Sequence, residues 1–350
     1  MGIKGIHNII KKYASDVYVE KHISEYAYKK VAIDISLYIF KYKAIFGEKW
    51  ISSFITLICC LRKYDLHFIF IFDGVAPEEK SIERNARKES REKMVNKINQ
   101  LETDLQHYKE TGEVSELISE IYNKTENDKP LRLLGKASKK IDVNVIQNEI
   151  DKLKSYNIGI TKKDIETVKE MFDIMEIPYV VADGEAECYA SQLCLNGCVD
   201  MVLSEDTDVL VYGTPTFLTK INTSTGVVIE MKFEKLLECL ELTHAQYVDL
   251  CILCGSDYNN TIRGVGPETA YKLMKEYGSI ENIPEKYDTS VLNYERVREL
   301  FSKRKLGLKI PYCGSLDEEK MTKFLFENNI RIDMEYMKMC FSEANIIFED

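Results

Sequence analysis

The chain has 350 residues, 45% of them hydrophobic, which suits one large α/β domain with elaborations or two domains. It has no run of 18 apolar residues and no secretory signal, and its ten cysteines lack the paired spacing of a zinc module, so we expect an intracellular protein with reduced thiols and no membrane partner. The formal net charge of −10 argues only weakly against a nucleic-acid partner, because metal-site carboxylates count toward the total and local patches matter more than the sum.

Two predicted strands near the N-terminus each end at an aspartate. After a short amphipathic helix with isoleucines at helical spacing, the run VAID predicts a buried strand that ends at Asp34. Residues 49–64 predict a buried helix, and FIFIF predicts a second strand, which Asp73 and Gly74 close. A single aspartate after a strand is more commonly a helix cap or a turn residue. A functional interpretation of these two aspartates depends on the acids that follow them in the chain.

Residues 80–97 are strongly basic. Lys80, Arg84, Arg87 and Arg91 follow a 4–3–4 spacing, which places them on one face of a helix. Such a run is commonly a solvated face. Here it directly follows Asp73, where a phosphate would need to be held, so both interpretations stay open.

The next part of the chain predicts a helical insertion. Apolar residues alternate spacings of 4 and 3 from Met94 to Tyr108, and helical patterns return at 117–122 and 146–153. A second basic cluster lies between them, at Lys129, Arg132, Lys136, Lys139 and Lys140. We expect residues 78–156 to form a mobile helical insertion that carries basic side chains above a ligand crevice.

The stretch from Ile177 to Asp208 carries two pairs of acids. Glu185 and Glu187 follow the strand-like run PYVVA, and Asp206 and Asp208 follow VDMVLS. In an open parallel sheet the carboxyl ends of the strands form the ligand crevice, and acids gathered there repel one another unless a cation binds among them. Oxygen ligands favour magnesium or manganese over zinc, which suggests a two-metal phosphodiesterase. The spacing leaves open whether each pair binds directly or through water.

Further strands are predicted at VLVYG, FLTKI and VVIEM, followed by a helix from Phe233 to Leu240. Asp257 then joins the set of acids. The run RGVGPETA combines a tight turn, Gly264 to Gly266, with Pro267 at the first position of a helix. Backbone N–H groups at such a helix start bind phosphate without reading sequence. We therefore expect a helix-hairpin-helix element here, and an acidic helical tail from Ser315 that does not contact DNA.

These motifs, taken together and in order, resemble the flap endonuclease branch of the structure-specific 5′ nucleases, the XPG/Rad2-type superfamily. The resemblance is carried by MGIKG, VAID, FDG followed by KS, PYVVADGEAE, SEDTD and LCGSDYNNTIRGVGPETA, and it extends from Met1 to about Phe341. It implies an α/β, PIN-like fold whose central, mostly parallel sheet is flanked by helices, with a helical arch and a helix-hairpin-helix. The domains expected are 1–77 and 157–240 for the nuclease, 78–156 for the arch, 241–310 for the helix-hairpin-helix and 311–350 for a C-terminal helical segment.

The resemblance also implies the site residues. Two Mg²⁺ ions, for which Mn²⁺ can substitute, would bind a carboxylate set formed by Asp34, Asp73, Glu185, Glu187, Asp206, Asp208 and Asp257. Lys80 and Arg87 would act on the scissile phosphate, and a K⁺ ion is implied at the helix-hairpin-helix. The DNA contacts expected are Gly2, Phe40, Arg84, Gly264 and Gly266.

The implied function is Mg²⁺-dependent cleavage at 5′ flaps or branched DNA during replication, repair or recombination. Phe40 stands where the family usually has a tyrosine, the segment between Arg87 and Glu185 is longer than in cellular flap endonucleases, and no sliding-clamp motif follows. We expect a monomer in the nucleus or, for a viral protein, at a cytoplasmic replication site. The alternatives are a related 5′-exonuclease or gap endonuclease, and a non-catalytic DNA-binding scaffold.

Overall fold

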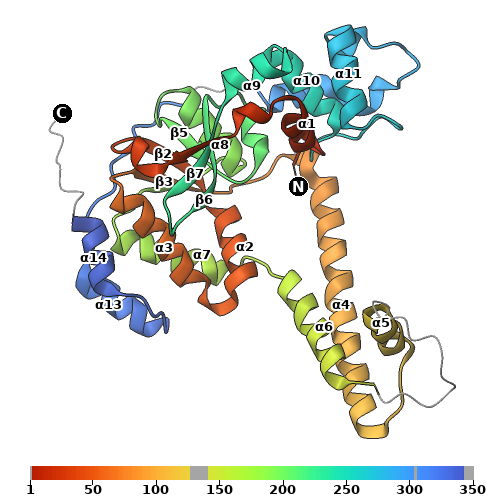
Figure 1. Cartoon of the computed structure of the whole chain (residues 1–350), viewed down its shortest axis with the longest axis vertical. Coiled ribbons are helices and arrows are strands. Elements are labelled where there is room, and N and C mark those ends of the chain that lie inside the picture. The colour runs from red at the N-terminus through yellow and green to blue at the C-terminus, as the bar shows by residue number, and fades with distance from the viewer. Residues whose placement is uncertain (1, 127–140, 303–305, 343–350) are drawn as a thin grey trace. The chain divides into compact units, whose positions relative to one another are not determined.

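The computed structural model describes residues 2–126, 141–302 and 306–342. The chain divides into two compact units, one formed by Met1–Ser81 with Ile160–Asp350 and the other by Ile82–Gly159 (Figure 1). The basic cluster at 129–140 falls outside the described residues. The five-part domain division expected from the sequence stays a prediction.

A seven-stranded sheet organises the first unit, in the order β1-β7-β6-β5-β2-β3-β4. Strands β2 to β6 pair in parallel, and β7 pairs antiparallel with both β6 and β1. The expected central, mostly parallel sheet is therefore confirmed. The strand bounds are β1 Val19–His22, β2 Lys30–Asp34, β3 His67–Phe72, β4 Tyr179–Val181, β5 Met201–Leu203, β6 Thr216–Asn222 and β7 Val227–Lys232.

Helices cover both faces of this sheet because its central strands are apolar on both sides. Along β3, Phe68 and Phe70 enter one core while Ile69 and Ile71 enter the other. The first core is closed by α2 Ile35–Phe46, α3 Trp50–Lys63, α7 Lys162–Ile174, α13 Glu318–Glu327 and α14 Met334–Ser342. The second is closed by α1 Ile6–Tyr13, α8 Ala186–Leu195, α9 Phe233–Leu240, α10 His244–Cys254, α11 Pro267–Tyr277 and α12 Tyr294–Leu300.

Short 3₁₀ helices connect these elements. They are η1 Ser15–Val17, η2 Ile23–Tyr26, η3 Gly47–Lys49, η4 Glu78–Lys80, η5 Thr207–Leu210, η6 Ile280–Asn282 and η7 Thr289–Leu292. The stretch Ile35–Lys63 is long and apolar enough to cross a membrane by length and composition alone. It consists of α2, η3 and α3, and many of its apolar side chains, such as Ile39, Phe54 and Ile58, pack in the first core. Burial against the sheet therefore accounts for much of its hydropathy.

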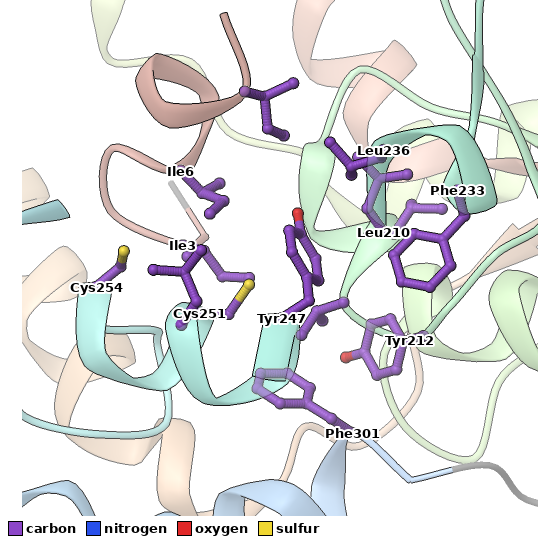
Figure 2. Close-up of a cluster of buried hydrophobic side chains, with 14 of the residues drawn as sticks. Ile3, Ile6, Leu210, Tyr212, Phe233, Leu236, Tyr247, Cys251, Cys254 and Phe301 are labelled. Atoms are coloured by element: carbon purple, nitrogen blue, oxygen red, sulfur yellow. The ribbon is translucent and has the colours of Figure 1, made fainter. Parts of the chain in front are cut away.

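The N-terminal segment packs into the second core beside α10. Figure 2 shows Ile3 and Ile6 beside Cys251 and Cys254, close to the ring of Tyr247. The backbone N–H of Lys4 donates to the Gly255 carbonyl, 2.9 Å away, at the end of α10. These contacts hold the first residues of the chain against α10.

The second unit has a small core of its own. Helices α4 Ser81–Thr111, α5 Glu116–Glu126 and α6 Val143–Tyr156 bury Leu101, Ile118 and Ile146 against one another. The hydroxyl of Tyr108 accepts a hydrogen bond of 3.0 Å from the N–H of Ile141, which ties α4 to the start of α6. The apolar spacing seen in the sequence is thus the seam of a helical bundle.

Three local predictions differ from the structure. VLVYG is not a strand, because Asp206 caps η5 by accepting from the Asp208 N–H at 3.0 Å and the chain turns at Gly213. The PYVVA strand is the half-exposed edge strand β4 rather than a buried one. Strand β1 was missed, because VEKH is short and polar and pairs only at the opposite edge of the sheet.

Candidate active site

The first two aspartates lie at the carboxyl ends of neighbouring strands. Asp34 ends β2 and caps α2, accepting from the Ser36 N–H at 2.9 Å. Asp73 follows β3, and its two oxygens accept from the Ser36 hydroxyl at 2.6 Å and the Ala186 N–H at 3.0 Å. Since β2 and β3 are adjacent and parallel, the two carboxylates lie at the same edge of the sheet, and the Ala186 contact brings the start of α8 to them.

The two glutamates belong to the start of α8 and not to a strand end. Strand β4 ends at Val181, Glu185 is the N-cap of α8, and Glu187 lies in its first turn. Both glutamates act on the Lys80 ammonium, and the charge of Glu185 also acts on Glu187, so the two carboxylates lie near each other at this helix start. The expectation that this pair directly follows a buried strand was wrong, because an irregular connection separates β4 from α8.

The second pair of aspartates completes a tight cluster. Asp206 and Asp208 lie at η5, with two residues between Asp206 and the end of β5, which is hydrogen-bonded to β2. One oxygen from each of Glu187, Asp206 and Asp208 lies within 4.8 Å of the others. An all-oxygen set at this separation has the chemistry that Mg²⁺ or Mn²⁺ prefers, so these residues fit a divalent cation.

Burial and mutual repulsion act strongly on these acids. Burial and the charge of Asp73 raise the pKa of Asp34 to about 8, and burial and the charge of Asp206 raise the pKa of Asp208 to about 8. Burial, followed by the charges of Asp34 and Glu185, raises the pKa of Glu187 well above its usual value. Holding all of these groups ionised together is unfavourable unless positive charge is supplied among them.

Lys80 supplies part of that positive charge. Its ammonium group, at the end of η4, contacts an oxygen of Glu185 and lies 3.5 Å from Asp257 Oδ2. Burial works against the charged form, but Glu185 and Glu187 outweigh it and raise the pKa of Lys80. The other oxygen of Glu185 accepts a hydrogen bond from the hydroxyl of Tyr258. Sequence reasoning missed Tyr258, whose one signal was its position directly after Asp257.

Gly2 lies against the carboxylate cluster. The N–H of Ile3 donates to Asp208 Oδ1 at 2.8 Å, and a Cβ added to Gly2 would stand 2.4 Å from both oxygens of Asp208. Gly2 also has a φ of +80°, which a residue with a side chain adopts at a cost. The start of the chain thus requires a glycine beside this site.

The other residues expected to contact DNA lie on separate elements. Phe40 is 40% exposed on α2. Gly264 has a φ of +81° and Gly266 is the N-cap of α11, and a Cβ added to either would meet no atom within 4 Å. Arg84 and Arg87 belong to the second unit, where Arg84 is exposed and the guanidinium of Arg87 pairs with Glu83. The roles assigned to these residues stay predictions.

Family models identify two regions of the chain. The XPG N-terminal domain matches residues 1–94, and the XPG I-region matches residues 176–257. The first region contains Asp34, Asp73 and Lys80. The second contains the acids from Glu185 to Asp257.

Curated relatives match over most of their length. The chain is 34% identical to probable RAD2-like endonuclease 076L of Invertebrate iridescent virus 3, over 95% of this chain and 92% of the relative. It is 30% identical to probable RAD2-like endonuclease 369L of Invertebrate iridescent virus 6, over 99% and 93%. It is also 28% identical to flap endonuclease 1 of Zea mays, over 94% and 83%.

Solved structures share the fold. The catalytic core of Rad2 in complex with DNA substrate superposes with a TM-score of 0.67 at 18% identity, over 98% of this chain and 100% of that one. Flap endonuclease-1 from Methanococcus jannaschii superposes with a TM-score of 0.60 at 22% identity, over 94% and 97%. The expected 5′-nuclease fold is confirmed. Together with the two domain matches and the full-length viral relatives, this shows that the chain belongs to the XPG/Rad2 family of nucleases.

Proposed function

We propose that this protein is a Mg²⁺-dependent, structure-specific 5′ nuclease that cuts phosphodiester bonds at 5′ flaps or branched junctions of DNA. The observation that supports this most is the convergence of Glu187, Asp206 and Asp208, whose oxygens lie within 4.8 Å of one another. The relatives are named as RAD2-like and flap endonucleases, and a scaffold protein would have no electrostatic reason to keep such an arrangement.

Seven carboxylates would hold the metal ions, with Glu187, Asp206 and Asp208 nearest one another and Asp34, Asp73, Glu185 and Asp257 around them. Two divalent cations bound there would provide an activated water and stabilise the leaving oxygen. The protein's own contribution is orientation. Ser36 and the Ala186 N–H each hold one oxygen of Asp73, and the Ile3 N–H holds Asp208, so these carboxylates need little rearrangement to bind.

Two basic residues are proposed to act on the scissile phosphate. Lys80 is supported by its position at Glu185 and Asp257, from which its flexible side chain can reach a phosphate held at the carboxylates. Arg87 is supported by its place on α4, where its spacing puts it on the same helical face as Arg84 and Arg91. Both would stabilise the charge that develops on the phosphate in the transition state.

The duplex is proposed to be held by its backbone at the start of α11. A Cβ added to Gly264 or Gly266 would meet no atom within 4 Å, so the N-terminus of α11 has open space beside it. The first N–H groups of a helix bind phosphate independently of sequence. A K⁺ ion would assist there. Gly2, Phe40 and Arg84 would complete the contacts, Phe40 by stacking on a base.

The second unit is proposed to be the arch that receives a 5′ single strand, and its three-helix core gives the arch a stable frame. The protein would act as a monomer on branched or 5′-flap DNA. The relatives come from viruses and plants, in keeping with an intracellular protein that acts on DNA. Its place would be the nucleus or, for a viral protein, a cytoplasmic replication site.

The test compares end-labelled double-flap, nicked, gapped and four-way-junction DNA, each incubated with the protein and Mg²⁺ or with EDTA. We expect Mg²⁺-dependent cutting near the base of the 5′ flap, faster than on the other substrates. Faster cutting of gapped DNA or of free 5′ ends would favour a gap endonuclease or 5′-exonuclease. Binding without cutting on every substrate would reject the enzyme and leave a DNA-binding scaffold.

A further inference from the structure

Lys80 occupies a position among the acids that a metal ion would also favour. Its ammonium contacts one oxygen of Glu185 and lies 3.5 Å from Asp257 Oδ2, and only 14% of its side chain is exposed. Hard cations bind carboxylate oxygens such as these. An ammonium and a divalent cation repel each other at such distances, so the two cannot share the same pair of carboxylates without a large penalty.

Contacts that do not involve the Lys80 ammonium hold both its backbone and Glu185. Glu79, on the same turn, is held by Arg296 at 2.6 Å, which anchors η4. Glu185 is held independently of Lys80, because the hydroxyl of Tyr258 binds its second oxygen. Tyr258 in turn packs edge-on against Phe301, with ring centroids 5.6 Å apart. The carboxylate would therefore keep its orientation after the ammonium left.

We propose that Lys80 and one of the divalent cations compete for Glu185 and Asp257, so that metal binding drives the Lys80 ammonium out of the carboxylate cluster. This rests on the proposed nuclease function and adds to it an order of events. Lys80 balances the acids until the metal arrives, and the metal then releases it toward the phosphate. Phosphate binding by Lys80 thereby becomes dependent on a loaded metal site.

The first test is calorimetric titration of Mn²⁺ into the full-length protein without DNA, for wild type, Lys80→Met and Lys41→Met. Lys41 is the matched control. It also forms a close ion pair near the cluster, but its partner is Glu205, the neighbour of Asp206 in the chain, instead of Glu185 or Asp257. Removing a competitor strengthens binding, so we expect Lys80→Met to bind Mn²⁺ about tenfold more tightly than wild type and Lys41→Met to bind it as wild type does.

Equal or weaker binding by Lys80→Met would overturn the inference, as would the same gain in both variants, since that would reflect net charge alone. A wild-type protein that takes up neither Mn²⁺ nor Mg²⁺ gives a different result, because it overturns the proposed function itself.

A second measurement needs no variant and so does not depend on Lys80→Met folding. The wild-type protein is treated briefly with an amine-acetylating reagent, with and without Mg²⁺, and modification of each lysine is read by mass spectrometry. We expect Mg²⁺ to raise acetylation of Lys80 several-fold and to leave Lys41 unchanged. A fall, or no change, at Lys80 would overturn the inference.

Discussion

Asp206 influences the pKa of several neighbouring acids through its negative charge. It contributes to the raised pKa of Asp34, Asp208 and Glu187, and one of its oxygens also caps η5. Asp206→Asn keeps an oxygen for the cap but removes the charge. We expect cleavage of a flap substrate to fall at least about 100-fold while DNA affinity stays within a factor of about two. Full activity in this variant would refute the assignment of Asp206 to the metal site.

Gly2 allows a prediction about the fit of the chain start against Asp208. In Gly2→Ala the new Cβ would stand 2.4 Å from both carboxylate oxygens, so either the N-terminal segment or Asp208 must shift. We expect a higher Mg²⁺ requirement for cleavage, measured as the Mg²⁺ concentration at half-maximal rate. Gly112→Ala is the control, because Gly112 also has a positive φ but no atom within 4 Å of the added Cβ. The same change in both variants would rule out a specific effect on Asp208.

At the scale of the element, the start of α11 can be tested without disturbing the fold. Gly266 has a φ of −98°, and a Cβ added to it would meet nothing within 4 Å, so Gly266→Ala is tolerated by the backbone. A methyl group there would fill part of the space that a phosphate bound at the start of α11 would occupy. We expect DNA affinity, measured by fluorescence anisotropy, to fall several-fold while the melting temperature and Mn²⁺ affinity stay unchanged. Unaltered affinity would place the duplex elsewhere.

Elements with strong local patterns could be predicted from the sequence, and those set by distant partners could not. The all-apolar run FIFIF and the isoleucine spacing of α1 predicted β3 and α1 correctly, because burial dictated each residue. VLVYG is as apolar as a strand, but a cap by Asp206 and a turn at Gly213 make it η5 and a loop. The polar strand β1 depends on pairing with β7, which lies some 200 residues later.

The candidate site likewise contains residues that the sequence predicted and contacts that it could not predict. The acids were visible because each follows a recognisable strand or motif, and the structure brings Glu187, Asp206 and Asp208 together. The contacts of Tyr258 with Glu185 and of Ser36 with Asp73 were not visible. They join positions far apart in the chain, and tyrosine and serine carry no signal of a metal site by themselves.

At the scale of the whole molecule, the crowded acids make stability depend on pH. The pKa values of Asp34 and Asp208 are raised to about 8 from the 3.8 of an ordinary aspartate, so the folded protein binds more protons than the unfolded chain between these values. Stability contributed by these groups is therefore present at low pH and is lost as pH rises toward 8. With EDTA present, we expect the melting temperature to fall from pH 5 to pH 8.5.

Saturating Mg²⁺ should reduce this fall, because the cation compensates the ionised carboxylates. Asp34→Asn serves as the matched control, since it removes one of the two groups and should show a shallower pH dependence in EDTA. A wild-type protein whose melting temperature rises through this range, or a variant with an unchanged slope, would contradict the electrostatic description of the cluster.

The measurement that tests the central claim most directly is anomalous diffraction from crystals of the full chain soaked in manganese chloride. The central claim is that divalent cations bind at one place in the fold. Acids from the ends of β2, β3 and β5 meet there with acids from the start of α8. The account predicts anomalous peaks within this group of carboxylates, one of them bounded by Glu187, Asp206 and Asp208. Manganese bound elsewhere in the crystal, with no peak among these residues, would contradict it.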